Sequence, residues 1–203
     1  MRSGSQWSFG ERHLKIILLS LASEHMSVIA TAQDQEGFRM PKKDGIAVER
    51  STFVKDQFGV IAKRDYKKGE VIFAVEGPVM PKPTKYSFSA GLNQHIEPIR
   101  KDGISDFGHY LNHSCDPNVV VRPINDEGPL RIDVIARRDI RAGEELAFDY
   151  ASLEYDVTVA NSPCQCGTDK CRGVMHGFKD MPEDVKERYK EEGIIAPYLL
   201  SLK

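Results

Sequence analysis

Residues 111–118, LNHSCDPN, place an amide, an imidazole, a hydroxyl, a thiol and a carboxylate in a row, followed by a proline. Neither a helix period nor a strand alternation accounts for such a run. Asn, Ser, Asp and Pro form turns, so one interpretation is a turn in which Asn112 and His113 bond only to nearby backbone. The other interpretation is a buried segment whose polar groups bind a small polar ligand.

The four cysteines favour a metal site over disulfides. Three of them, Cys164, Cys166 and Cys171, form the pattern C-x-C-x4-C. Two disulfides are arithmetically possible, but cysteines two residues apart do not pair easily. Zinc takes four ligands and binds thiolates well, so Cys115 is the natural fourth ligand, with His176 or water as the alternative. A thiolate site indicates a reducing, intracellular compartment.

A nucleophilic role for the thiol of Cys115 is a further interpretation. His113 could serve as its base. Neighbouring residues on one chain rarely point at a common atom in the geometry that a dyad needs. The ligand count for zinc also uses this thiol, so we favour the metal site.

The composition is that of a soluble globular chain. Its 203 residues are 40% hydrophobic and 29% charged, with a net charge of −2. Such a chain can form one domain with a core, and it does not suggest nucleic-acid binding through a basic surface. The apolar run 13–23 is too short to cross a bilayer. It could be a signal-peptide core, but the thiolate site argues against export. We expect residues 1–44 to be a poorly ordered extension or to contain one short helix.

Short β-like runs separated by turn residues predict a strand-rich domain after this extension. Residues 60–73, VIAKRDYKKGEVIF, align without gaps with residues 134–147, VIARRDIRAGEELA, and share seven of fourteen positions. Each copy contains a strand, a charged turn with a glycine, and a second strand. We therefore expect the same hairpin-like unit twice. Two copies do not make a solenoid.

The end of the chain has a different pattern. Pro182 precedes a charged, helix-favouring run that ends at Glu192, and Gly193 is a typical helix stop. We expect a helix here that caps the domain. Residues 81–110, by contrast, hold prolines, glycines and aromatics, and favour a loop with one or two short strands.

The run GEELAFDY, residues 143–150, alternates after a glycine turn and ends in Asp149 and Tyr150. A tyrosine at a strand end is often a filler of the core. In a pocket, however, its hydroxyl can orient a substrate amine or assist proton movement.

Three motifs in this order, NHSCDPN (112–118), GEELAFDY (143–150) and C-x-C-x4-C (164–171), resemble those of the SET-domain protein lysine methyltransferases with a post-SET zinc tail. FGVIAKRDYKKGE (58–70) resembles the opening cofactor motif of that family. The resemblance covers residues 46–175. It implies a small stand-alone SET domain that methylates lysine in a protein substrate.

The resemblance implies a mainly β fold, the β-clip of small curled sheets, with short helices and a C-terminal helix. A pseudoknot is also implied, in which the segment containing Asn112 passes under the chain that ends in Tyr150. We expect a SET domain at 45–152, a post-SET zinc segment at 153–176 and a helical cap at 177–203.

Residue roles follow from the same resemblance. The backbone of Phe58 and Gly59 would lie against S-adenosylmethionine, and Asn112 and His113 would hold its adenine side. Tyr150 would contact the cofactor, act as the catalytic tyrosine and line the lysine channel. The remaining implied positions are the channel residue Phe148 and the ligands of one structural zinc, Cys115, Cys164, Cys166 and Cys171.

The chemistry implied by the resemblance needs a neutral lysine amine in line with a sulfonium methyl. An unperturbed lysine has a pKa of about 10.4. An apolar channel and a nearby sulfonium both favour the neutral amine. Tyr150 is then an orienting and electrostatic group rather than a strong base. Phe148 occupies a position where the family uses Phe or Tyr, and the missing hydroxyl implies multiple methylation.

Three positions depart from the family pattern. Gln57 replaces a glycine two residues before Gly59, His109 replaces a frequent arginine, and Val75 replaces a frequent tyrosine of the channel wall. Because of Gln57 and Val75, the alternative function is a catalytically weak or inactive module that binds a peptide or a partner protein. The expected partner in either case is a protein, histone or non-histone, with no nucleic acid and no membrane.

Overall fold

The computed structural model describes residues 40–41, 43–126, 128–157 and 162–202. Residues 1–39, most of the expected N-terminal extension, therefore lie outside the described residues. The expected boundaries at residues 152 and 176 fall inside one compact unit, Glu36–Lys203, and stay predictions.

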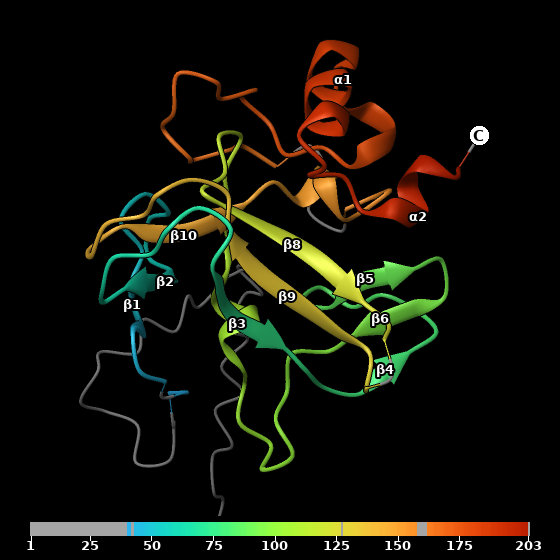
Figure 1. Cartoon of the computed structure of the whole chain (residues 1–203). Coiled ribbons are helices and arrows are strands. Elements are labelled where there is room, and N and C mark those ends of the chain that lie inside the picture. Colours follow the sequence, from blue (N-terminus) through green and yellow to red (C-terminus); the bar gives the residue numbers. More distant parts are fainter. Residues whose placement is uncertain (1–39, 42, 127, 158–161, 203) are drawn as a thin grey trace, which may run out of the picture. The chain divides into compact units, whose positions relative to one another are not determined.

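The architecture is mainly β, as expected, and its described strands form three small sheets (Figure 1). The first sheet has the order β1-β2-β10-β7: β1 (Ile46–Arg50), β2 (Phe58–Ala62), β10 (Glu145–Phe148) and β7 (Asn112–His113). The second has the order β3-β9-β8: β3 (Val71–Val75), β9 (Arg131–Ala136) and β8 (Val119–Ile124). The third has the order β4-β6-β5: β4 (Val79–Met80), β6 (Gln94–Ile96) and β5 (Phe88–Gly91).

β-Branched residues and a two-residue period explain the strands of the second sheet. Along β9, RIDVIA, half-buried and buried positions alternate, as in a strand with one covered face. β8 begins with three buried valines, Val119, Val120 and Val121, which join the main core cluster. Figure 1 shows β3, β9 and β8 as neighbouring arrows.

Helices are short, and the longest lies near the end of the chain, as expected. The described helices are η1 (Phe107–Tyr110), η2 (Tyr150–Ser152), η3 (Phe178–Asp180), α1 (Glu183–Glu191) and α2 (Pro197–Leu200). Helix α1 follows Pro182 and buries Val185 and Tyr189, and Gly193 after it has a φ of 65°. Among the described residues, no helix has the length and apolar character needed to span a bilayer.

The two copies of the internal repeat do not form hairpins, which corrects the expectation from the sequence. β2 and β3 of the first copy lie in different sheets. β2 pairs with β10, and β3 pairs with β9, so each copy pairs with the other. The reason is the connection between β2 and β3, residues 63–70, which exceeds the two to five residues of typical hairpin loops.

Equivalent positions of the two copies make equivalent bonds. Gly69 N–H donates to Ala136 O and Gly143 N–H donates to Ala62 O, each at 2.8 Å. The ion pairs of the two turns also correspond, Arg64–Glu70 and Arg138–Glu144, each at 2.6 Å. The repeat in the sequence is therefore a local two-fold relation in space, and its two turns are interchangeable in their backbone requirements.

This two-fold relation predicts that substitution of either turn glycine lowers the free energy of unfolding by the same amount. Gly69 and Gly143 have φ values of 86° and 95°, and a Cβ at either would meet no atom within 4 Å. Alanine at each position should lower the free energy of unfolding by about 1 kcal/mol, because only the backbone conformation is strained. Urea denaturation measures this, with Lys68→Ala in the first turn as the control. A cost at only one of the glycines would contradict the equivalence.

Candidate active site

The segment 112–118 is buried beside β10. Asn112 and His113 pair in parallel with Ala147 and Phe148, and Ser114 N–H donates to Phe148 O at 3.0 Å. The side chain of Asn112 donates to Phe58 O (2.9 Å), which is distant in sequence. The interpretation as a turn with local bonds only is therefore wrong, and the segment joins β10 to β2.

A buried carboxylate organises this junction. Glu145 accepts hydrogen bonds from Asn112 Nδ2 (2.7 Å), Ser51 Oγ (2.9 Å) and Thr52 N–H (2.6 Å). A Cβ on Gly59 would collide with the same carboxylate. The predicted cofactor residue Gly59 thus has to be a glycine because Glu145 covers it. Glu145 was not predictable as a site residue, because its only signal in the sequence is a charge next to an apolar strand run.

Tyr150 lies directly after β10, at the start of η2. Its hydroxyl donates to Leu111 O (3.1 Å), and its backbone N–H donates to His113 Nδ1 (3.2 Å). Burial raises the pKa of Tyr150 above its ordinary value, so the phenol stays protonated at neutral pH. Burial also lowers the pKa of His113 to about 4, which keeps that imidazole neutral. The hydroxyl is therefore a hydrogen-bond donor and not a base.

Aromatic rings surround Tyr150. The ring centroid of Phe148 lies 4.9 Å from that of Tyr150, and the His113 ring lies 5.1 Å away in an edge-on arrangement. Phe88 of β5 stacks on Phe148 at 5.5 Å with an interplanar angle of 26°. Phe88 carries no recognisable signal in the sequence, because its contact with β10 spans two sheets.

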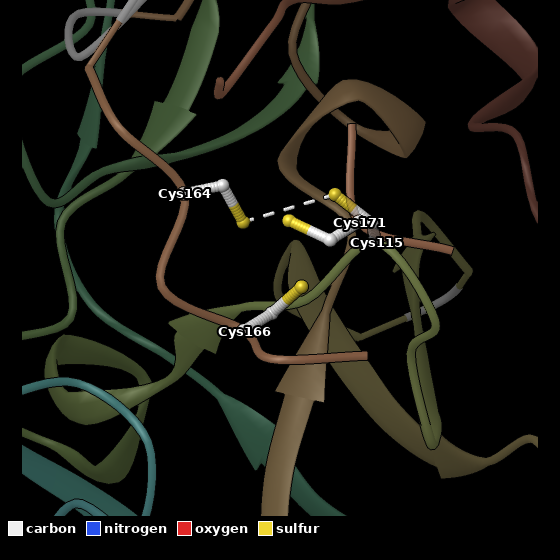
Figure 2. A group of neighbouring side chains, drawn as sticks. All are labelled: Cys115, Cys164, Cys166 and Cys171. Atoms are coloured by element: carbon white, nitrogen blue, oxygen red, sulfur yellow. Dashed lines mark hydrogen bonds between the residues drawn. The ribbon is translucent and has the colours of Figure 1, made fainter. Parts of the chain in front are cut away.

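The four cysteines come together as the ligand count predicted. Their sulfur atoms all lie within 4.8 Å of one another, and all four thiols are free, so the disulfide alternative is wrong. Figure 2 shows the thiols of Cys115, Cys164, Cys166 and Cys171 gathered around a common centre. His176 is not a member of this group. The arrangement is compatible with tetrahedral metal binding.

The environment of Cys115 argues against a nucleophile. His113 Nε2 does lie 3.4 Å from its sulfur atom. Burial nevertheless raises the pKa of the Cys115 thiol to about 11, against the lowering effect of Arg172. The backbone N–H of Arg172 donates to this sulfur at 3.4 Å, and this bond does not offset the effect of burial on the thiol.

A buried ion pair connects the cysteine tail to the end of β10. Arg172 donates to both oxygens of Asp149, at 2.7 and 2.8 Å, and Asp149 is fully buried. Tyr189 of α1 donates to the same carboxylate at 3.1 Å and contacts Cys115 O at 3.3 Å. In the sequence Asp149 stands out only as the neighbour of Tyr150, and neither of its partners was predicted.

The three departures from the family pattern have different surroundings. Gln57 is exposed. Val75 is fully buried, and a Cβ on Gly108 would lie 2.9 Å from its methyl groups, so Val75 fills the space under η1. His109 stacks on Tyr86 with ring centroids 3.9 Å apart.

Comparison with known proteins gives one family. A family model described as "SET domain" matches residues 57–151. The chain is 31% identical to "Histone-lysine N-methyltransferase TRX1" of Oryza sativa subsp. japonica over 64% of the chain and 14% of that protein. It is 30% identical to "Histone-lysine N-methyltransferase ASHH3" of Arabidopsis thaliana (56% of the chain, 34% of that protein). It is 37% identical to "Histone-lysine N-methyltransferase, H3 lysine-4 specific" of Saccharomyces cerevisiae (46% and 8%). The chain thus spans about a third or less of these relatives.

The buried pair of Asp149 and Arg172 generates a prediction on stability. Arg172→Met should lower the free energy of unfolding by about 3 kcal/mol, because it leaves a buried carboxylate without its cation. Arg138→Met is the matched control, since Arg138 grips Glu144 with the same two-pronged geometry at an exposed site. It should cost less than about 1 kcal/mol. Equal losses in chemical denaturation would contradict the assigned importance of Arg172.

Proposed function

We propose that this chain, whose residues 57–151 match the SET-domain family model, transfers methyl groups from S-adenosylmethionine to lysine side chains of a protein. The observation that carries the proposal is the junction at the end of β10. There the ring of Tyr150 lies against Phe148, and its hydroxyl bonds to Leu111 O, just before the buried segment that begins at Asn112. The sequence similarity to histone-lysine N-methyltransferases supports the same reaction class.

The residues around β7 fit an adenosine-containing cofactor. Among the described strands β7 lies at the edge of its sheet, so none of them pairs with the outer side of its backbone. We propose that Asn112 and His113 offer these backbone groups to the adenine. Both amide hydrogens of Asn112 already bond to Phe58 O and Glu145. The side chain of Asn112 therefore positions Phe58 and Gly59, whose backbone would lie along the cofactor.

The side chains near Tyr150 would prepare the lysine amine. When bound, S-adenosylmethionine supplies a methyl group activated by its sulfonium. The rings of Phe148 and Tyr150 form an apolar lining, which favours the neutral amine because burial disfavours the ammonium form. The hydroxyl hydrogen of Tyr150 goes to Leu111 O, so the hydroxyl oxygen can accept from an N–H of that amine and orient it. Phe148 offers no hydroxyl to anchor water, so we propose that the enzyme adds more than one methyl group.

We propose that Cys115, Cys164, Cys166 and Cys171 bind one structural zinc ion. The donor set supports this, because four thiolates close a tetrahedral site and leave no open position for chemistry. The ion would fasten the tail at residues 164–171 to the segment that follows β7. The tail also contacts the loop before β2, because the side chain of Gln165 accepts a hydrogen bond from Lys55 N–H (3.2 Å).

For the substrate we propose only a class, a protein with an accessible lysine. Relatives with histone-lysine N-methyltransferase names support a histone, and a non-histone protein with an accessible lysine is the alternative. The second candidate function is a module that binds a protein without turnover. Val75 favours it, because the valine is fully buried where the family places a channel aromatic.

Methyl transfer generates the first functional prediction. The purified chain, given methyl-tritiated S-adenosylmethionine and core histones or a cell lysate, should label a protein. Tyr150→Phe should reduce the initial rate by about a hundredfold, because it removes the orienting hydroxyl. Tyr155→Phe, on an exposed tyrosine five residues later, should leave the rate unchanged. Cofactor binding without any label would favour the non-catalytic module, and a folded protein with neither would exclude the methyltransferase.

Zinc generates the second prediction. Elemental analysis should find one zinc ion per chain, and Cys171→Ser should lose it. Retention should fall as the pH falls, because burial raises the pKa of the Cys115 thiol to about 11 and protons compete with the metal. The affinity should drop by up to about tenfold per pH unit for each proton taken up. Full zinc content in Cys171→Ser would contradict the four-cysteine site.

A further inference from the structure

A glutamate just after the proposed catalytic turn grips a strand of another sheet. Glu154 Oε1 accepts from the backbone N–H of Ser89 (2.9 Å), and Glu154 Oε2 accepts from the hydroxyl of Ser89 (2.5 Å). Glu154 N–H donates to Tyr150 O (2.8 Å), so the glutamate and the tyrosine belong to one closed turn. One carboxylate therefore joins this turn to β5.

The grip on Ser89 is buried and internally consistent. Ser89 and His95 are 2% and 5% exposed. A serine hydroxyl has one hydrogen, which goes to Glu154, so its oxygen accepts from His95 Nδ1 at 2.8 Å. Burial raises the pKa of Glu154, while the two hydrogen bonds from Ser89 lower it. The chain thus keeps an acidic group at a site where its charge is costly.

The strand held by this grip carries part of the aromatic lining. Phe88 precedes Ser89 on β5 and stacks on Phe148, which in turn contacts the ring of Tyr150. These contacts link the turn of Tyr150 and Glu154 to Ser89 of β5. The neighbouring Phe88 packs on Phe148, which in turn contacts Tyr150. A shift of Ser89 would move Phe88 relative to Phe148, because the two residues are adjacent in one strand.

We propose that Glu154 is a positioning residue that sets how tightly Phe88 packs against Phe148, and thereby limits how many methyl groups a lysine receives. This inference rests on the proposed function. A methylated amine needs room beside the aromatic lining to rotate until its lone pair faces the methyl group of the cofactor. In an apolar site the space for one methyl group changes relative rates by about 10- to 200-fold, so a small displacement of Phe88 is enough to shift the product ratio.

The side chain at 154 has to be an acid for this role. Both donors on Ser89 point at it, and a carboxylate offers two acceptors. Glutamine offers one acceptor and places an NH₂ group against a donor, although its shape is the same. Glu154→Gln therefore loosens β5 without removing volume. Ser89→Ala removes the hydroxyl and keeps the backbone N–H, so it loosens the same contact to a smaller degree.

The test compares product states on core histones at saturating S-adenosylmethionine by mass spectrometry. In Glu154→Gln, the ratio of trimethylated to monomethylated lysine at equal turnover should rise at least about threefold over wild type. Ser89→Ala should shift it in the same direction. The double variant should match Glu154→Gln alone, because both changes break one contact. Glu187→Gln, at an exposed position of α1, is the matched control and should change nothing.

The outcomes separate the two proposals. A slower reaction with an unchanged product ratio in Glu154→Gln and Ser89→Ala would overturn the positioning role, even with the methyltransferase activity intact. If Glu154→Gln fails to fold, the ratio in Ser89→Ala decides. An unchanged Michaelis constant for the cofactor is expected, since both side-chain hydrogen bonds of Glu154 go to Ser89 of β5. No label transfer by the wild-type protein would overturn the proposed function, and this inference with it.

Discussion

The ion pair between the buried carboxylate of Asp149 and Arg172 is the interaction on which the proposed active site depends. Asp149 lies between Phe148 and Tyr150 and receives two hydrogen bonds from Arg172 and one from Tyr189. These partners come from the cysteine tail and from α1. A carboxylate without solvent requires such compensation, so the tail and the helix have to be in place before the end of β10 is stable. The position of Tyr150 therefore depends on segments that are distant from it in the sequence.

A second carboxylate does the same at the other end of β10. Glu145 binds Ser51 and Thr52 of the loop before β2 and Asn112 of β7, and it covers Gly59. β10 is thus fixed at both ends by buried acids whose donors come from the proposed cofactor and metal segments. Its middle, by contrast, is held by apolar packing and by the pairings with β2 and β7. β10 has only four residues, yet it can position residues of both the proposed cofactor site and the proposed metal site, because a buried carboxylate fixes each of its ends.

Local chemistry predicted part of this arrangement. Four thiols with one tight spacing leave few ways to satisfy zinc, so the cysteine cluster followed from the sequence. The strand-rich class and the helix after Pro182 also followed, because period and turn residues act locally. The partners of Asp149 and Glu145 did not, since any charged residue of the chain could have supplied them. The repeat was recognised but misinterpreted, because a sequence shows that two segments are alike and does not show whether each folds on itself or on the other.

That mutual pairing makes the two copies of the repeat depend on each other for folding. β2 leans on β10 and β3 on β9, so neither copy of the repeat completes its own sheets. An isolated copy would expose strand edges on both sides, and the surface that best fits those edges is another copy of itself. Each copy therefore needs the other to cover its strand edges, and the chain between them, residues 74–133, has to return before either copy can pair.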